Sequence, residues 1–524
     1  MKKALRLFLA IIVVSSMIAG FGTPADSADK KVLRWGKEME AIGNLDVNVT
    51  NENNIYELSD LMLDTLVMKN PQTMAIEPNL ADLPKISEDG ALYTFKLKEG
   101  VKFVNGDELT AEDVEFTFYR VFAPQYNGLN TWFADMITGA QALMDGNADN
   151  LEGFKVIDKY SFSIRIDYPF SAFVSVLASS PFGIVNKKEC LAAGDKWGLS
   201  TVVGTGAYKL VKFEPNVNIV FETNKDYFKG APGLDGIEMV HMSSETAALE
   251  FEAGNIDLYT LNTDQIETYK NDPKFSKLMK YQEFQTTVYM MFNQSKKPLD
   301  DVRVRNAVSL AINADVIVDQ YFDGNVTAAN TYIPKGMIGY TDSAKKLTYD
   351  PEKAKQLLAE AGYPDGVTIT VSESNRSSYI EIVQIMKEQM KAANINLELE
   401  LTEAAAWMDA RRNGALMAYD NGYTADYPDP DQFFYSIFRS DASKNRSTGL
   451  ESPEVDARID QGRLITDPAE KQAHYEALDR FIVSENYNLR PLYYLASYTL
   501  VSDRVENVFQ KNDRLMYLGN AKIK

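Results

Sequence analysis

Cysteine and histidine are almost absent from this chain of 524 residues, which contains one cysteine and two histidines. A single cysteine cannot form an intramolecular disulfide, and it cannot build a cysteine-rich zinc or iron–sulfur site. The histidines, His241 and His474, lie far apart in the sequence, which disfavours Ser-His catalysis and histidine-bound metals. We interpret Cys190 as a small buried hydrophobic residue and both histidines as structural residues.

Positive charge is also scarce, because 54 Lys and Arg residues face 74 Asp and Glu residues, for a net charge of −20. An acidic surface repels phosphate backbones and anionic membranes, which argues against nucleic acid as a partner. Apolar residues nevertheless make up 45 % of the chain and aromatic residues 11 %. Together with the length, this composition predicts a folded protein of roughly two to four domains.

The only long apolar segment lies at the N-terminus. Lys2, Lys3 and Arg6 precede an apolar run that extends to Phe21 and is followed by a polar stretch, which is the layout of a secretory signal peptide. The run is shorter than the roughly 20 apolar residues that a spanning helix needs. We therefore expect residues 1–27 to be removed, with cleavage after Gly22, Ala25 or Ser27.

Removal of this segment takes away three bases and one acid, so the mature chain would carry 51 − 73 = −22 charges. The sequence Ile18-Ala19-Gly20 is similar to the start of a bacterial lipoprotein cleavage box, but Phe21 stands where lipidation requires a cysteine. We therefore expect a periplasmic protein without a lipid anchor.

Two regions have clear secondary-structure patterns. Apolar and polar residues alternate over 93–98, which predicts a strand, and a capping box at 110–113 begins a helix that continues to 122. From residue 349 onward the pattern alternates between helix and strand, and it predicts a largely parallel βαβαβ sheet. Its expected elements are a helix from Asp350-Pro351 to Gly362, strands at 367–371, 395–401 and 415–420, and helices at 379–393 and 404–413.

Ligands of such sheets bind beyond the C-terminal ends of the strands, which points to the loop expected at 421–431. Asp426 lies there between Tyr423 and Tyr427, where its carboxylate can accept hydrogen bonds from a cationic ligand. Asp429 and Asp431 are typical helix-capping acids. The three acids also leave a calcium site open, although the spacing and glycine of an EF-hand are missing.

Catalytic and cofactor fingerprints are absent from the sequence. We find no Gly-x-Ser-x-Gly elbow, no phosphate loop ending in Gly-Lys-Ser/Thr and no dinucleotide fingerprint, so we expect no cofactor. A glycosidase that uses two carboxylates stays open, because the chain has many acids and no feature marks a particular pair.

An ordered set of motifs resembles the family-5 extracytoplasmic solute-binding proteins of ABC importers, the oligopeptide- and dipeptide-binding group. The resemblance extends over nearly the whole mature chain, and each motif is weak alone. The matching segments are 77–81, 93–103, Asn105-Gly106, 109–114, 204–208, 224–227, Asn293, 301–307, 361–363, 422–427 and Asp429-Pro430.

The resemblance implies an α/β fold of the type II (cluster C) periplasmic-binding-protein kind, with two lobes around a cleft and an extra domain inserted in the first lobe. The implied domains are, in sequence order, the first segment of lobe I (28–75), the inserted domain II (76–199), the second segment of lobe I (200–296), lobe II or domain III (297–494) and the third segment of lobe I (495–524).

The resemblance also implies a ligand site. In peptide-binding relatives, the aspartate of the motif that matches residues 422–427 pairs with the α-amino group of the peptide. The residues before it bond the peptide backbone as a neighbouring strand does. These roles carry over to Asp426 and to Gly422, Tyr423 and Thr424, and we add Asn421 as the first residue of the same loop.

One departure affects the other end of the ligand. Asp420 occupies a position where one oligopeptide binder has an arginine that can meet the ligand carboxylate, and a negative charge there would repel that group. Arg376 is our candidate for the missing positive charge, within a loop and helix start that also include Asn375 and Tyr379. Arg411 and Arg412 are less favoured, because they are expected to lie on a solvated helix face.

The resemblance therefore implies a monomeric, non-catalytic binding protein that closes on an extended peptide and delivers it to the permease subunits of an ABC importer. Three alternatives stay open at this point. They are a family-5 binder of an oligosaccharide, a binder of a nickel chelate, and an exported hydrolase that depends on carboxylates.

Overall fold

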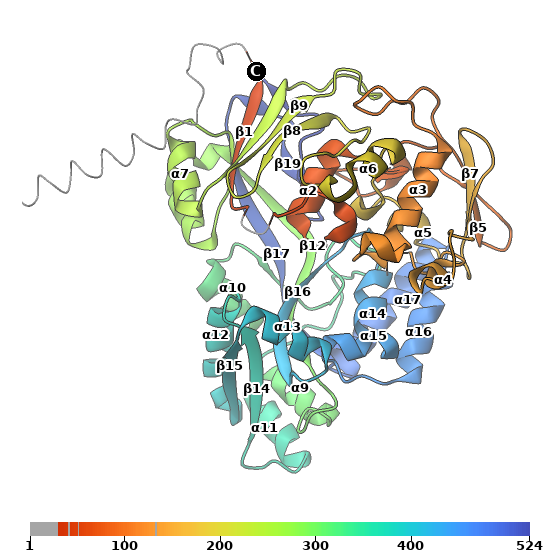
Figure 1. Ribbon diagram of the computed structural model, residues 1–524. Helices are drawn as coiled ribbons and strands as arrows, with labels where there is room; N and C mark the ends of the chain where they lie inside the picture. Colours follow the sequence, from red (N-terminus) through yellow and green to blue (C-terminus); the bar gives the residue numbers. More distant parts are fainter. Residues whose placement is uncertain (1–29, 40–41, 51, 132–133) are drawn as a thin grey trace, which may run out of the picture.

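The computed structural model describes residues 30–39, 42–50, 52–131 and 134–524, so the expected signal peptide and lipoprotein box lie outside the described residues. Figure 1 shows an upper region that contains the N-terminal strands and the C-terminus, and a lower region formed by residues from the second half of the chain. We call the upper sheet, made of strands β1, β8, β9, β10 and β11, together with the C-terminal residues 502–524, lobe I. We call the lower sheet, made of strands β14, β15 and β16, together with its surrounding helices, lobe II.

Two long strands connect the lobes. β12 (Met279–Phe292) and β17 (Leu489–Val501) pair antiparallel from Met279 opposite Leu500 in lobe I to Met291 opposite Leu489 in lobe II. Through them one sheet of eleven strands continues from lobe to lobe, in the order β15-β14-β16-β12-β17-β11-β1-β10-β9-β8, with β13 (Thr327–Ala328) pairing β17 beside this path. Their register shifts between Glu283 and Thr287, at the level between the lobes.

Lobe I has a mixed sheet whose inner residues are apolar. β1 runs parallel to β10 and β11, while β8 and β9 extend the sheet antiparallel. Its elements are β1 (Val32–Lys37), α2 (Asn53–Met62), β8 (Tyr208–Glu214), β9 (Asn218–Thr223), β10 (Gly236–His241), α7 (Ser244–Glu252), β11 (Leu258–Thr260) and α8 (Ile266–Asn271). The C-terminal chain returns to this lobe as β18 (Val505–Glu506), β19 (Phe509–Gln510), β20 (Met516–Tyr517) and β21 (Lys522–Ile523).

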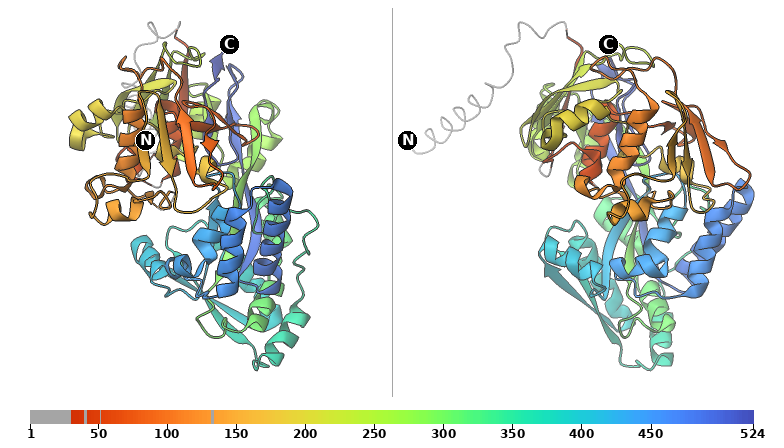
Figure 2. Two further views of the ribbon diagram at one scale, coloured as in Figure 1. Left: turned by 90° about the vertical axis from the view of Figure 1, so that its right-hand side faces the viewer. Right: turned by 45° about the vertical axis from the view of Figure 1, so that its right-hand side comes forward.

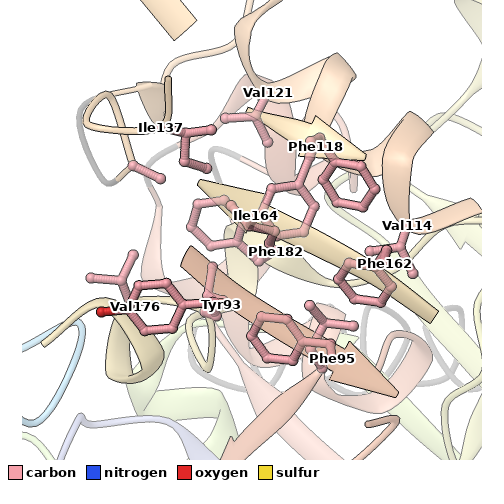
Figure 3. Close-up of a cluster of buried hydrophobic side chains, with 14 of the residues drawn as sticks. Tyr93, Phe95, Val114, Phe118, Val121, Ile137, Phe162, Ile164, Val176 and Phe182 are labelled. Carbon is pink, nitrogen blue, oxygen red and sulfur yellow. The ribbon is translucent and has the colours of Figure 1, made fainter. Parts of the chain in front are cut away.

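A separate four-stranded sheet lies beside lobe I, and we call it, with its helices, the inserted domain. The strand order is β4-β5-β7-β6, with bounds β4 (Lys85–Ile86), β5 (Leu92–Lys96), β6 (Phe154–Val156) and β7 (Ser161–Arg165). As expected, α3 (Ala111–Phe122) begins at a capping box formed by Thr110 and Asp113. Figure 3 shows the aromatic core between this helix and the sheet, where the Phe95 and Phe162 rings stack 5.3 Å apart.

Lobe II contains the alternating region. β14 (Val367–Ser374) runs parallel to β15 (Ile395–Thr402) and to β16 (Ala418–Thr424), which confirms the expected parallel sheet. Asp350 caps its helix as expected. The helices on one side of the sheet are α9 (Val302–Leu310), α10 (Ala314–Phe322), α11 (Pro351–Glu360) and α12 (Ile380–Met390). Those on the other side are α13 (Ala404–Arg412), α14 (Asp431–Phe438), α16 (Pro453–Leu464) and α17 (Pro468–Arg480).

The expected end of the last strand at residue 420 is wrong. β16 continues to Thr424, so the first four residues of the expected loop 421–431 belong to the strand. The physical reason is the partner strand, because β12 pairs with β16 along all seven residues and overrides the turn preference of Asn421-Gly422. The domain boundaries expected at 75, 199, 296 and 494 stay a prediction.

Contacts also join lobe II to the inserted domain, as the views in Figure 2 indicate. The Arg463 guanidinium donates a hydrogen bond to the Tyr168 hydroxyl at 2.9 Å, and the Lys471 ammonium donates one to the Ser171 hydroxyl at 2.9 Å. In the region of the chain that the structure describes, no helix has the length and apolar character to cross a membrane.

The rare cysteine and histidines have structural roles. Cys190 is buried, and burial raises the pKa of its thiol to about 11, which makes it unreactive. His241 Nδ1 accepts a hydrogen bond from the Met39 amide at 2.9 Å, and His474 Nε2 lies 2.8 Å from the Arg458 carbonyl oxygen. Both histidines therefore hold backbone in place.

Candidate ligand-binding site

One edge of strand β16 is open at its C-terminal end. β12 covers the other edge completely, whereas β14 meets β16 only where Val371 faces Ala418. The Asp420 amide points away from β12, because it donates to the Glu373 carboxylate at 2.7 Å. Backbone groups two residues apart in a strand point to the same edge, so Gly422 and Thr424 direct their N–H and C=O groups to the open edge.

Asp426 lies two residues beyond this edge. Its carboxylate is half-buried and accepts a hydrogen bond from the Gln432 side-chain amide, while the Gln432 oxygen accepts one from the Asp426 N–H at 2.8 Å. Burial raises the pKa of Asp426 to about 6, although Lys69 and the Gln432 hydrogen bond act to lower it. The result is a fixed carboxylate whose charge is only partly compensated by the protein.

Residues from the upper region of the molecule lie close to Asp426. The Lys69 ammonium donates to the Asp426 carbonyl oxygen at 3.1 Å and forms an ion pair with Asp513 at 2.6 Å, and the Ser179 hydroxyl donates to the same carbonyl at 3.2 Å. A small cavity of about 20 Å³ next to the carboxylate is lined by Asn53, Tyr56, Lys69, Ser179, Ser180, Pro181, Ala425, Asp426, Asp513 and Leu515. Asp426 therefore lies where the lobes meet.

The two neighbouring tyrosines face away from any ligand. Tyr423 is buried, packs against Phe433 with ring centres 5.3 Å apart and bonds the Ser436 hydroxyl at 2.8 Å. Tyr427 belongs to the core of the inserted domain. The two side chains therefore do not line the space beside the Asp426 carboxylate, and the Tyr423 backbone groups point to β12 rather than to the open edge.

Asp429 and Asp431 neutralise buried bases. Asp429 pairs with Lys471, and Asp431 lies 3.3 Å from the Arg463 guanidinium. No group of three or more acids, histidines and cysteines suited to a metal ion occurs among the described residues. The two aspartates act as structural partners of lobe II, and the calcium alternative loses its ligands.

Asn375, Arg376 and Tyr379, the residues expected near the C-terminal carboxylate of the ligand, do not lie together. Asn375 and Arg376 are exposed, and the Asn375 amide donates to the Glu403 carboxylate at 2.7 Å. Tyr379 instead reaches over the face of β16 next to the open edge, because a Cβ added at Gly422 would lie 3.0 Å from its hydroxyl oxygen. Glycine at 422 thus makes room for this hydroxyl.

Arg411 corrects a second expectation. Its guanidinium stacks over the Trp407 ring, 5.4 Å from the ring centre, and burial lowers the pKa of Arg411. Only Arg412 has the exposed position that we expected for both residues.

Asp420 is buried together with Glu373, each 1 % exposed. Burial raises the pKa of Glu373 to about 7, and burial together with the neighbouring Glu373 raises the pKa of Asp420 well above its ordinary value. Two carboxyl groups this close do not both ionise near neutral pH. Asp420 therefore carries less negative charge near neutral pH than the sequence alone suggests.

Sequence reasoning missed Arg514. It lies in the turn between β19 and β20, with φ of 74°, and its exposed guanidinium forms no hydrogen bond or ion pair with any residue that the structure describes. The surrounding protein still desolvates this group and lowers the pKa of Arg514, and the nearby Tyr379 of lobe II and Glu57 of lobe I counteract this effect. No motif marks Arg514, because only the folded C-terminal turn brings it opposite Tyr379.

Two lobes joined by a pair of long strands, with an open strand edge and a carboxylate between them, define a two-lobed solute-binding protein. The sequence profile of the bacterial extracellular solute-binding proteins, family 5 (middle region), matches residues 75–445. The chain belongs to this family, whose members bind substrates outside the cytoplasm.

Several known proteins are similar over most of their length. The heme-binding protein A of Haemophilus influenzae is 28 % identical over 467 residues, covering 83 % of this chain and 82 % of the relative. The periplasmic oligopeptide-binding protein OppA of Salmonella typhimurium is 27 % identical over 553 residues, with 97 % of each chain covered. The structure of HbpA2 from Haemophilus parasuis has a TM-score of 0.80 at 24 % identity and covers 94 % of this chain and 100 % of that chain.

The fold is also similar to that of a protein solved with a peptide. The structure of Haemophilus influenzae OppA in complex with the peptide RPPGFSPFR has a TM-score of 0.77 at 23 % identity and covers 94 % of this chain and 99 % of that chain. These likenesses confirm the expected two-lobed fold.

Proposed function

We propose that this protein is the peptide-binding component of an ABC importer. The observation that carries the proposal is the open edge of β16, where Gly422 and Thr424 present unpaired backbone groups next to the fixed carboxylate of Asp426. An extended peptide can add to this edge as a strand and place its α-amino group at Asp426. Curated relatives named as oligopeptide- and dipeptide-binding proteins support the same ligand class.

In this proposal the backbone groups of Gly422 and Thr424 supply the main-chain hydrogen bonds between β16 and the ligand. Asp426 supplies the charged anchor, and Arg514, rather than Arg376, receives the C-terminal carboxylate of a short peptide. The lobes close by bending of β12 and β17 at the register shift, which brings Arg514 toward lobe II, where Lys69 already contacts Asp426.

The protein would be exported by the N-terminal signal, released into the periplasm without a lipid anchor and would act as a monomer. Its partners would be the permease subunits of the importer, to which it delivers the peptide without chemical change. An oligosaccharide is less favoured, because sugar sites use exposed aromatic faces and both Tyr423 and Tyr427 are buried.

Native mass spectrometry of the purified protein tests this function. Bound peptides should appear as a distribution of added masses that disappears after unfolding and refolding. A single uniform mass increment, or turnover of an added glycan by the protein, would contradict the proposal.

A further inference from the structure

Two buried acids lie at the beginning of the open edge of β16. Glu373 lies on β14 just beyond Val371, the residue at which β14 pairs with β16. Its carboxylate accepts a hydrogen bond from the Asp420 N–H at 2.7 Å, where a paired strand would offer a backbone carbonyl. Its other oxygen accepts a hydrogen bond from the Ser377 hydroxyl at 2.6 Å. The Glu373 carboxylate therefore lies in the plane of the sheet, where the next strand would begin.

The Asp420 carboxylate has no such support. Both of its oxygens are buried without a hydrogen-bond partner, and neither acid forms an ion pair with any lysine or arginine that the structure describes. A buried carboxyl group without partners is unfavourable, and proteins rarely retain one without a use. Both oxygens lack a hydrogen-bond donor, so the missing partner is a donor, and a cationic donor would also stabilise the ionised form of the acid.

The position of the pair connects it to the ligand edge. Asp420 and Gly422 lie on the same face of β16, since side chains two residues apart point to the same side. The Tyr379 hydroxyl lies over Gly422, and burial, opposed by Arg514 and reinforced by Asp420, raises the pKa of Tyr379. The Tyr379 hydroxyl thus lies over the face of β16 that also carries the Asp420 side chain.

The distance along the strand fixes which region of a ligand is involved. Asp420 and Asp426 are six residues apart, or about 20 Å along an extended chain. A peptide whose amino group is at Asp426 covers about 10 Å between its first and fourth residues, and a long side chain can cover much of the remainder.

We propose that Glu373 and Asp420 form a subsite for a cationic side chain, lysine or arginine, at the third to fifth residue of the bound peptide. This proposal rests on the proposed function. Binding of the cation supplies donors to both Asp420 oxygens and favours the ionised form of the two carboxyl groups, so that a proton held by the pair is released to solvent. The protein would thus select peptides with a free amino group and a basic residue inside the chain.

Calorimetry with matched peptides on the full chain tests the subsite. The probes are Ala-Ala-Arg-Ala-Ala and its isomers with arginine at position four or five, each paired with a peptide that carries neutral citrulline instead. The wild-type protein should bind at least one arginine peptide about tenfold or more tightly than its citrulline partner. Asp420→Asn should reduce this ratio to about threefold or less without weakening the citrulline peptide.

Two further variants keep the result interpretable. Glu398→Gln removes an exposed acid from β15 in the same lobe and should leave the ratio unchanged. Glu373→Gln should lower the ratio as Asp420→Asn does, and it serves as the test if Asp420→Asn does not fold, which its thermal unfolding shows.

The outcomes separate this inference from the proposed function. Equal affinity for arginine and citrulline peptides, with both bound in a manner that needs Asp426, overturns the subsite and leaves peptide binding intact. An equal loss for both peptides in Asp420→Asn also overturns the subsite, because the pair would then act in lobe closure. Failure of the wild-type protein to bind any of the peptides overturns the proposed function together with the subsite.

Discussion

Substitution of Asp426 by asparagine is the most informative single change. Asparagine has the same shape, and its side-chain oxygen can still accept the hydrogen bond from Gln432, so the local fold should persist. Only the negative charge is lost. A hydrogen bond between charged groups contributes about 1.5–3 kcal/mol, so peptides with a free amino group should bind roughly 10-fold to 150-fold more weakly.

The assay is a cycle of two changes, measured by isothermal titration calorimetry. Wild type and Asp426→Asn are each titrated with one tripeptide and with its N-acetylated form. The wild-type protein should prefer the free amine strongly, whereas the variant should bind the two forms alike. Asp365→Asn, which removes an exposed charge from a turn of lobe II, should behave as the wild type. If Asp426→Asn retains the full preference for the free amine, Asp426 does not anchor the amino group.

Three other predictions concern the same cleft. Burial holds the pKa of Asp426 at about 6, so its carboxylate is ionised above pH 6. The affinity for a free-amine peptide, measured by calorimetry, should therefore fall by up to about tenfold per pH unit below pH 6. Constant affinity from pH 7 to 4.5 would contradict this prediction. Arg514→Ala should lower the affinity for peptides with a free C-terminal carboxylate about fivefold in fluorescence titrations, and it should leave the affinity for amidated peptides unchanged. An equal effect on both kinds of peptide would show that Arg514 does not meet the carboxylate. Gly422→Ala should weaken peptide binding about fivefold, because the added methyl group would lie 3.0 Å from the Tyr379 hydroxyl. Gly43→Ala is the control, because its methyl group meets no atom within 4 Å, and it should bind peptides normally. Unchanged binding in Gly422→Ala would mean that the ligand does not use this edge.

The local features of the fold were predictable from the sequence. The helix starts at Thr110 and Asp350 depend on residues within one turn, and the structure has both caps. The parallel order of β14, β15 and β16 follows from the alternation of helices and strands, and it is also confirmed. The end of β16 was not predictable, because Asn421-Gly422 is a turn signal and the partner strand β12 is more than a hundred residues away.

The candidate site shows the same division. Asp426 was found because it lies in a recognisable motif beyond a strand. The raised pKa of Asp420 depends on its burial and on Glu373, which is 47 residues earlier in the chain, so the sequence alone suggested an ordinary ionised aspartate. Arg514 belongs to an unremarkable turn, and only the return of the C-terminal chain to lobe I brings it opposite Tyr379.

A crystal structure of the protein with a bound free-amine peptide tests the central claim most directly. We predict that the peptide lies along the open edge of β16, pairs with the backbone of Gly422 and Thr424, and places its amino nitrogen about 3 Å from the Asp426 carboxylate. A peptide bound elsewhere, or one whose amino group is remote from Asp426, would contradict the assignment of this edge as the binding site.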